Sequence, residues 1–219
     1  MTPGKLCGYA GRLSSEYDPD LHHIASSRRL SSDKKYIIAM EIRTLEEKKY
    51  PDFLTLYNQT FPEDQRRSYR DEQHLARFIK EKGGKFSAYA AVDGDLFLGF
   101  LSYWKFQGYV YIEHFAVHPE HRGRNIGSRL LQHLMKEQGE NVLVEVEPAG
   151  TDKAADDRIR FYERNGFRTR EEINYVQPPY SPEKAPVKLL LMTHGDVKLT
   201  GKDDMREMLQ DVYNVNYGG

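Results

Sequence analysis

The stretch from Tyr109 to Gln138 constrains the fold more than any other part of the chain. Residues 109–117 are mostly aromatic and β-branched, a composition that predicts a strand. Pro119 cannot donate a hydrogen bond to a sheet and ends it. Apolar residues then recur at helical spacing up to Gly139, a typical helix end: Ile126, Leu130, Leu131, Leu134 and Met135. The sequence therefore predicts a strand, a turn rich in arginine and glycine, and a helix.

The turn between this strand and this helix has the features of an anion site. The first amides of a helix lack intrahelical partners, so a phosphate placed there meets several donors at once. A hydrogen bond to a charged group is worth roughly 1.5–3 kcal/mol, against ~0.3–1 kcal/mol for the helix dipole. The amides should therefore dominate, with Arg122 and Arg124 assisting, while Gly123 and Gly127 let a ligand approach the backbone. Taken alone, the turn is explained equally well as a solvated connection.

Spacing decides which anion motif the turn resembles. A Walker loop has four residues between its glycines and then Lys-Ser/Thr, which is not the spacing of Gly123 and Gly127, and the dinucleotide fingerprint is absent too. The turn resembles the R-x-x-G-x-G/A loop of the GNAT superfamily of acetyl-CoA-dependent N-acetyltransferases, which binds the CoA pyrophosphate. Arg122 and Gly127 match its first and last positions, whereas Asn125 replaces the middle glycine. Because Asn tolerates left-handed backbone and is a good N-cap, we expect the loop to survive.

A second motif, Phe161 to Phe167, is similar to the GNAT element in which a helix ends in F-Y-E-x-x-G-F. In that family the tyrosine hydroxyl reaches the CoA sulfur, so the resemblance implies this role for Tyr162. The family usually carries an Asn and an Ala upstream, where Ala155 and Arg158 stand here, so the contacts of that Asn are not carried over.

The order of predicted elements is also that of the GNAT family. It begins with a strand at 40–45, a helix within 46–61, and a second helix from about Ser68, where Ser68 and Asp71 have a capping-box-like spacing, to 82. Strands at 85–92 and 96–104, joined by a turn at Asp93-Gly94, then lead into the strand, turn and helix described above. A strand at 142–147, a helix ending at Gly166 and strands at 167–169, 173–176 and 188–193 follow. The resemblance implies an α/β class (α+β mixed sheet): a GNAT-like acyl-CoA N-acyltransferase fold with a central mixed sheet flanked by helices.

Three regions are expected along the chain. Residues 1–35 show no sustained period and are predicted to be a poorly ordered N-terminal extension. Residues 36–194 form the predicted N-acetyltransferase domain. Residues 195–219 form a C-terminal tail with an amphipathic helix, which is expected to dock on the domain or on a second subunit in a possible homodimer.

Acetyl transfer to an amine requires a base for the ammonium proton and a donor for the departing thiolate. Glu113 is the preferred base, because partial burial on a strand face shared with Tyr111 and Phe115 would raise its pKa. A structural carboxylate with water as base is an equal alternative. His114, on the opposite face with Ile112 and Ala116, is interpreted as a core histidine.

Some further site residues follow from their place on the strands, and the splay of the central strand follows from the resemblance. Glu145 and Glu147 on the neighbouring strand are reserve bases. Transfer of the Tyr162 proton to a thiolate is uphill by ~1.5 pKa units, so Tyr162 either donates this proton or only hydrogen-bonds the sulfur. The central strand is expected to splay at Phe115, Ala116 and Val117, whose amides would meet the carbonyl oxygen. The predicted acetyl-CoA-binding residues are Phe115, Ala116, Val117, Arg122, Gly123, Arg124, Asn125, Ile126, Gly127, Ser128 and Tyr162, and the predicted catalytic residues are Tyr162 and Glu113.

Composition excludes several other classes of protein. Cys7 is the one cysteine, which excludes an intrachain disulfide and a cysteine-based metal site, so no metal is predicted and a cytoplasmic location is expected. The 32 basic and 33 acidic residues nearly balance, so no nucleic acid is expected, and Arg66-Arg67 is interpreted as a solvated pair. No apolar run in the N-terminal part of the chain has the length of a membrane span.

These observations lead to one expected function. The chain is expected to transfer an acetyl group from acetyl-CoA to a primary amine by direct attack in a ternary complex, with a small-molecule acceptor favoured. The alternatives are acetylation of a protein N-terminus or lysine, and a non-catalytic CoA-binding sensor or interaction module that requires neither Glu113 nor Tyr162.

Overall fold

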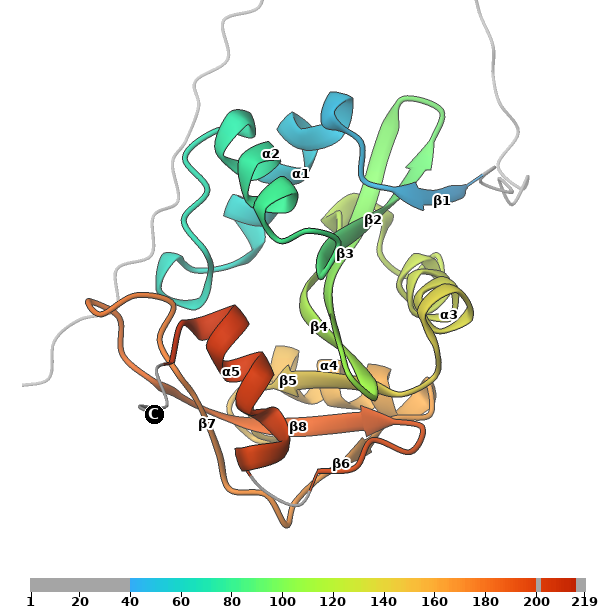
Figure 1. Ribbon diagram of the computed structural model, residues 1–219. Helices are drawn as coiled ribbons and strands as arrows, with labels where there is room; N and C mark the ends of the chain where they lie inside the picture. The colour runs from blue at the N-terminus through green and yellow to red at the C-terminus, as the bar shows by residue number, and fades with distance from the viewer. Residues whose placement is uncertain (1–39, 200–201, 216–219) are drawn as a thin grey trace, which may run out of the picture. The chain divides into compact units, whose positions relative to one another are not determined.

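The computed structural model describes residues 40–199 and 202–215, so the extension predicted for residues 1–35 lies outside the described part. A mixed sheet has the strand order β1-β2-β3-β4-β5-β8-β6, and β7 pairs with β8 (Figure 1). The strands are β1 (Glu41–Thr44), β2 (Phe86–Asp93), β3 (Leu96–Phe106), β4 (Tyr109–Val117), β5 (Val142–Val146), β6 (Arg168–Thr169), β7 (Tyr175–Gln177) and β8 (Val187–His194). The expected class, a central mixed sheet flanked by helices, is confirmed.

Most neighbouring strands run antiparallel. The hairpin predicted at Asp93-Gly94 joins β2 to β3, since Asp93 pairs with Leu96 across the turn. The strand predicted for residues 109–117 is β4, which continues the meander antiparallel to β3. In contrast, β4 and β5 run parallel. A parallel pair needs a crossover, and here α3 supplies it.

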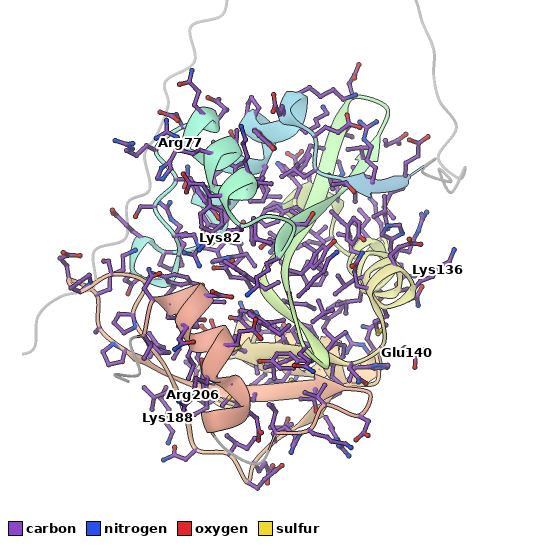
Figure 2. All side chains as sticks on the ribbon, viewed as in Figure 1. Arg77, Lys82, Lys136, Glu140, Lys188 and Arg206 are labelled. Carbon is purple, nitrogen blue, oxygen red and sulfur yellow. The ribbon has the colours of Figure 1, made fainter. Side chains whose placement is uncertain are left out.

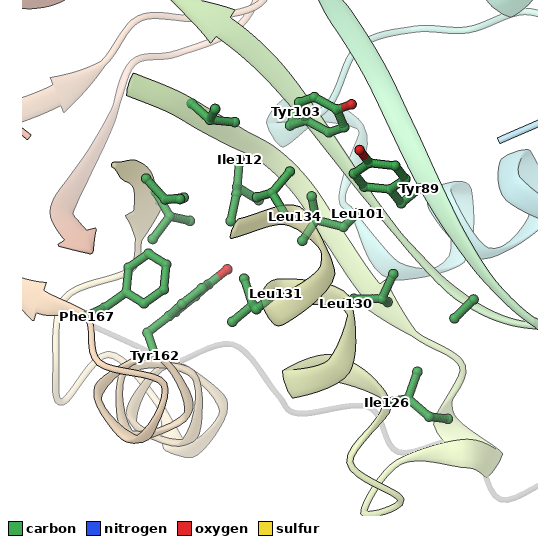
Figure 3. Close-up of a cluster of buried hydrophobic side chains, with 14 of the residues drawn as sticks. Tyr89, Leu101, Tyr103, Ile112, Ile126, Leu130, Leu131, Leu134, Tyr162 and Phe167 are labelled. Atoms are coloured by element: carbon green, nitrogen blue, oxygen red, sulfur yellow. The ribbon is translucent and has the colours of Figure 1, made fainter. Parts of the chain in front are cut away.

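Helices cover both faces of this sheet (Figure 1). They are α1 (Tyr50–Thr60), α2 (Glu72–Glu81), α3 (Ile126–Gln138), α4 (Lys153–Arg164) and α5 (Arg206–Tyr213). On one face, Leu130, Leu131 and Leu134 of α3 form a core with Tyr162 of α4 (Figure 3). On the other face, α1 and α2 pack against Ala88 and Ala90 of β2, while α5 packs further along the sheet.

The start of α2 differs from the prediction of a helix beginning near Ser68 with a capping box. Asp71 is the N-cap, and its Oδ1 accepts a hydrogen bond from the His74 backbone N–H at 2.7 Å. Residues 68–70 are not helical, and Tyr69 packs in the core beside Phe53 and Tyr57. Tertiary packing thus overrides the local capping signal.

The helix expected after residue 194 is α5, and it packs on the sheet of its own domain. Met208, Leu209 and Val212 are buried in one cluster with Trp104 and Leu143. At the surface, the Lys85 ammonium pairs with Glu207 and Asp211 of α5, at 2.8 Å in both cases. The apolar stripe predicted from the sequence is therefore covered by this chain.

Charged side chains lie on the outer faces of these helices. Arg77 on α2 and Lys136 on α3 are exposed and project from the surface (Figure 2). Within residues 40–199 and 202–215, no helix is long and apolar enough to cross a membrane.

Candidate active site

A cleft opens where β4 and β5 separate. The two strands pair at Val110–Val142, Tyr111–Leu143 and Ile112–Val144, and the ladder ends there. Beyond this point, residues 113–117 and 145–147 line a cleft of about 1170 Å³. The facing backbone edges of the two strands are no longer bonded to each other, so their N–H and C=O groups can meet a ligand. The splay expected near residues 115–117 thus begins directly after Ile112.

A β-bulge at Glu113 changes which side chains share a face of β4. On β3, Ser102 pairs with His114 and Tyr103 pairs with Ile112, which leaves Glu113 without a partner. Glu113 and His114 consequently both point toward the face covered by α1, α2 and α5, whereas Phe115 packs with the α3 core. The expectation that Glu113 shares a face with Phe115, and that His114 lies opposite, is wrong because strict alternation ends at the bulge.

The loop at residues 122–128 lines one end of the cleft. Gly123 and Asn125 both have positive φ, at 76° and 60°, so Asn125 adopts the expected left-handed backbone. Its side chain makes no capping hydrogen bond, which leaves the first amides of α3 without a side-chain partner. A Cβ on Gly127 would lie 3.2 Å from the Phe161 ring and 3.4 Å from Phe115. Glycine therefore allows α3 to start close against these rings.

Arginines of this loop differ in position. Arg122 is exposed, lines the cleft and donates from Nε to the Val117 carbonyl at 3.2 Å, so its terminal guanidinium nitrogens remain for a ligand. Arg124 does not line the cleft. The other predicted acetyl-CoA-binding residues, from Phe115 to Val117 and from Arg122 to Ser128, do line it, as does Tyr162.

Glu113, the predicted base, is held in a buried ion pair. Its Oε1 accepts from Arg67 Nη2 at 3.0 Å and from Nε at 3.2 Å, and its Oε2 accepts from the Trp104 indole at 2.7 Å. Burial alone raises the pKa of this carboxyl, but the Arg67 charge and these hydrogen bonds outweigh burial, so its pKa lies below the ordinary value. The expectation that burial would raise this pKa is therefore wrong, since it did not include a cationic partner.

Arg67 is not the solvated residue that its sequence context suggested. Its side chain is only 14% exposed, and its guanidinium lies over the rings of Phe78 and Tyr180, at 4.7 and 5.3 Å from their centres. Nη2 also donates to the Val212 carbonyl of α5 at 2.7 Å. Arg67 thus joins the α1–α2 connection, β4 and α5.

Glu145, which the sequence suggested as a reserve base, accepts hydrogen bonds from two tyrosine hydroxyls and not from a cationic side chain. Its Oε1 accepts from the Tyr175 hydroxyl at 2.5 Å, and its Oε2 accepts from the Tyr213 hydroxyl at 2.8 Å. Burial raises the pKa of Glu145 to about 7, even though both hydrogen bonds lower it. Because Glu145 lines the cleft, it combines access to a ligand with a pKa near neutrality.

His114 follows Glu113 on β4, and its imidazole stays neutral. Burial lowers its pKa to about 4, and its ring packs edge-on against Tyr57 and Phe61. The Nε2 atom lies 3.4 Å from the Gln65 carbonyl. His114 therefore has the surroundings of a core histidine at the edge of the cleft.

Tyr162 lies on the α3 side of the cleft, beside Phe167 and Leu131 (Figure 3). Burial raises its pKa, so the phenol is un-ionised at neutral pH. Its hydroxyl makes no hydrogen bond to another described residue. Nearby, Arg158 forms an ion pair with Glu147, which removes that second reserve carboxylate from consideration as a free base.

One group of side chains among the described residues could hold a metal ion. His118, Glu120 and His121 offer ligand atoms that all lie within 4.8 Å of one another. The Nδ1 atoms of both histidines have no hydrogen-bond partner there. This group precedes the loop at residues 122–128, and His121 lines the cleft.

Sequence reasoning missed Arg67 and Tyr213 as parts of the site. The partners of Arg67 lie 46 residues away at Glu113 and 145 residues away at Val212. Tyr213 reaches Glu145 across 68 residues. Neither contact leaves a local pattern, and the one available signal was the abundance of tyrosine, with 15 copies in the chain.

Comparisons with known proteins agree with this architecture. Residues 50–167 match the profile of the acetyltransferase (GNAT) family. A putative acetyltransferase from the GNAT family of Bacteroides thetaiotaomicron has a structure with a TM-score of 0.68 and 31% identity, covering 80% of this chain and 99% of that one. The putative acetyltransferase YjbC of Bacillus subtilis is 22% identical over 145 residues, which is 66% of this chain and 71% of YjbC.

The fold extends to more distant structures. A spermidine N-acetyltransferase of Vibrio cholerae, solved as a dodecamer, has a TM-score of 0.54 and 12% identity, covering 71% of this chain and 92% of that one. At this identity the likeness concerns the fold.

Proposed function

Because the chain belongs to the acetyltransferase (GNAT) family, we propose that it transfers an acetyl group from acetyl-CoA to a primary amine by direct attack in a ternary complex. The observation that carries the proposal is the cleft between β4 and β5, which the loop at residues 122–128 and Glu145 both line. Acetyl-CoA is the cosubstrate of this family, and it supplies an activated acetyl group as a thioester. The residues of this chain must bind it, orient the amine and move two protons.

The loop at residues 122–128 fits the pyrophosphate of CoA. The first residues of α3, whose amides have no side-chain cap, line the cleft together with Arg122. Glycine at position 127 lets this first turn lie close against the Phe161 and Phe115 rings, which also line the cleft. Each hydrogen bond from an amide to a charged oxygen is worth roughly 1.5–3 kcal/mol. The unpaired edge of β4 at residues 113–117 supplies further backbone donors along the cleft.

We assign the role of base to Glu145 rather than to Glu113. A base must be deprotonated and reachable, and it works best with a pKa near the working pH. Glu145 lines the cleft and has a pKa of about 7. The Glu113 side chain is fully buried and already accepts hydrogen bonds from Arg67 and Trp104. Glu113 instead keeps Arg67 in place beside the acceptor end of the cleft.

Tyr162 is the candidate donor to the thiolate sulfur. Its un-ionised hydroxyl makes no hydrogen bond to another described residue, so it can donate to a ligand atom in the cleft. Burial raises its pKa, which makes full transfer of its proton to a thiolate of pKa ~8.5 more uphill than for an ordinary phenol. A hydrogen bond that stabilises the developing negative charge is therefore the role that fits Tyr162.

The acceptor end of the cleft favours a small amine. Its lining includes Phe61 and Gln65 from the connection after α1, Gln177 at the end of β7, and Tyr180 from the connection between β7 and β8. Lys184 Nζ donates to the Arg66 carbonyl at 2.7 Å and so joins the two loops. A peptide substrate needs an open groove across this region, whereas a small amine does not. Acetylation of a protein N-terminus or lysine is the second candidate, and CoA binding without turnover is the third.

Two measurements test this function. Acetyl-CoA should raise the melting temperature of the parent protein, and Arg122→Glu or Gly127→Asp should abolish the rise. Lys136→Glu is the matched control, because it makes the same change of charge on the exposed face of α3 (Figure 2). A parent protein without any shift would contradict binding.

Turnover is then followed as thiol release from acetyl-CoA over monoamines, polyamines and peptides. Release with small amines supports the proposal, and release with peptides alone supports the second candidate. If acetyl-CoA raises the melting temperature but no thiol is released with any amine or peptide, the third candidate, CoA binding without turnover, is supported.

A further inference from the structure

The hydroxyl of Tyr213 is the meeting point of three polar groups from three strands. It lies 2.8 Å from Glu145 Oε2, 2.9 Å from the Tyr111 hydroxyl and 2.9 Å from Gln177 Nε2. These partners belong to β5, β4 and β7. The Tyr213 side chain is 4% exposed, so water cannot replace a lost partner easily.

The chemistry of these groups fixes the direction of each hydrogen bond. A phenol has one proton to donate and two lone pairs to accept with. The Gln177 Nε2 group can only donate, and a carboxylate can only accept, so Tyr213 accepts from Gln177 and donates to Glu145. Tyr111 must then donate to Tyr213. The hydroxyl is fully satisfied in one arrangement, with its proton directed at Glu145.

Helix α5 is held firmly enough to keep this hydroxyl in place. Its carbonyl at Val212, next to Tyr213, accepts from the buried Arg67 guanidinium at 2.7 Å. The Lys85 ammonium pairs with Glu207 and Asp211 on the helix. The Tyr213 ring also packs against Tyr180, with 5.0 Å between ring centres.

We propose that Tyr213 is a positioning residue for Glu145, so that α5 forms part of the catalytic apparatus. The inference rests on the proposed role of Glu145 as base. Tyr213 and Tyr175 each hold one carboxylate oxygen, which fixes the plane of the carboxylate and leaves its remaining lone pairs for the amine proton. Helix α5 lies outside residues 50–167, which match the family profile, so the proposed role of Tyr213 depends on an element that the profile does not include.

The electrostatic surroundings of Glu145 give the expected direction of change. The groups that face it are Tyr111 and Glu113 on β4, Tyr175 on β7 and Tyr213 on α5. Burial and the negative charge of Glu113 raise the pKa of Glu145, whereas the tyrosine hydroxyls lower it. Removing the Tyr213 hydroxyl should therefore raise this pKa further, and the carboxylate should become available as a base only at higher pH.

Tyr213→Phe tests the inference, with Tyr109→Phe as matched control. Tyr109 belongs to the same buried cluster, but its hydroxyl has no hydrogen-bond partner among the described residues. In Tyr213→Phe, the acidic limb of the kcat/KM profile should move to higher pH by about 1 unit, while the melting shift caused by acetyl-CoA stays that of the parent. Tyr109→Phe should leave the limb in place. An unmoved limb in Tyr213→Phe would overturn the proposal.

A second variant covers the case in which Tyr213→Phe does not fold. Fluorinated tyrosine placed at position 213 keeps the shape of the ring and makes its hydroxyl a stronger donor. The acidic limb should then move to lower pH, the direction opposite to that in Tyr213→Phe. A movement to higher pH, or none, would contradict the role of Tyr213.

Titration of the Glu145 carboxyl by infrared difference spectroscopy, with Glu145→Gln to assign the band, separates this inference from the proposed function. If the band titrates differently in Tyr213→Phe and parent, the coupling holds even where no amine is acetylated. If amines are acetylated and the band does not respond to Tyr213→Phe, the function stands and the inference fails.

Discussion

Arg67 Nη2 lies 3.0 Å from Glu113 Oε1, in an ion pair whose carboxylate side chain is fully buried. Breaking a buried pair by removing one partner costs roughly 3–5 kcal/mol, because the other charge is left uncompensated. We expect Glu113→Gln to lower the free energy of unfolding by this amount in urea denaturation. The double variant Arg67→Met with Glu113→Gln should lose less than the sum of the single variants. Additive losses would show that the two side chains do not interact.

Glu113→Gln should also keep an acidic limb in the activity profile, because Glu145 is the proposed base, but should move it to lower pH, because the negative charge of Glu113 raises the pKa of Glu145. Its pKa lies below the ordinary value in the folded state. The stability it contributes is therefore present above the unfolded pKa of ~4.3 and is lost as pH falls through the folded pKa. A limb that disappears in Glu113→Gln would return the role of base to this residue.

Glu145 should show the opposite dependence of stability on pH. Its pKa is raised to about 7 in the folded state, so its contribution is present below the unfolded pKa and is lost as pH rises through about 7. We expect the parent to lose stability relative to Glu145→Gln between about pH 5 and pH 8, by on the order of 3 kcal/mol or less. Parallel stability curves for the two proteins would contradict the raised pKa. The same variant should lower kcat by roughly 10²–10⁴-fold.

Tyr162→Phe should lower kcat by roughly 10- to 100-fold, the effect of losing one hydrogen bond to a developing charge. The melting shift with acetyl-CoA should persist, because the ring and its packing against Phe167 are kept. Tyr103→Phe serves as the control, since Tyr103 belongs to the same core cluster but does not line the cleft. Equal turnover in Tyr162→Phe and parent would remove the hydroxyl from the mechanism.

Substitutions of Asn125 test the backbone conformation of the loop at residues 122–128 without changing the charge of the loop. At φ 60° a β-branched residue is strained, so Asn125→Val should lower stability by about 1–2 kcal/mol and weaken the shift with acetyl-CoA. Asn125→Gly should keep both. Asn214, at φ 56° after α5, is the matched position, where the Val substitution should cost stability and leave the shift unchanged. Loss of the shift in Asn125→Gly would mean that the Asn side chain itself contacts the ligand.

The elements of this fold were predictable because their signals are local. Periodicity and the glycine at residue 139 place α3 within its observed bounds, and the apolar strand signal places β4. Which face of the sheet each side chain of β4 points to beyond Tyr111 was not predictable. The bulge depends on the pairing with β3, and it does not alter the alternation of residue types in the sequence. The pKa directions of Glu113 and Glu145 depend on which one meets Arg67, a contact made across 46 residues.

Glu113 is the extra residue of β4 in a literal sense. Without it, Ile112 would be followed by His114, and each remaining side chain would keep the face that it has now, because the bulge already separates two regular halves of the strand. Deleting Glu113 would therefore keep the other side chains of β4 on their present faces, but it would leave the buried Arg67 guanidinium without its carboxylate partner. The one residue that interrupts the regular alternation of β4 is thus also the counter-ion of Arg67.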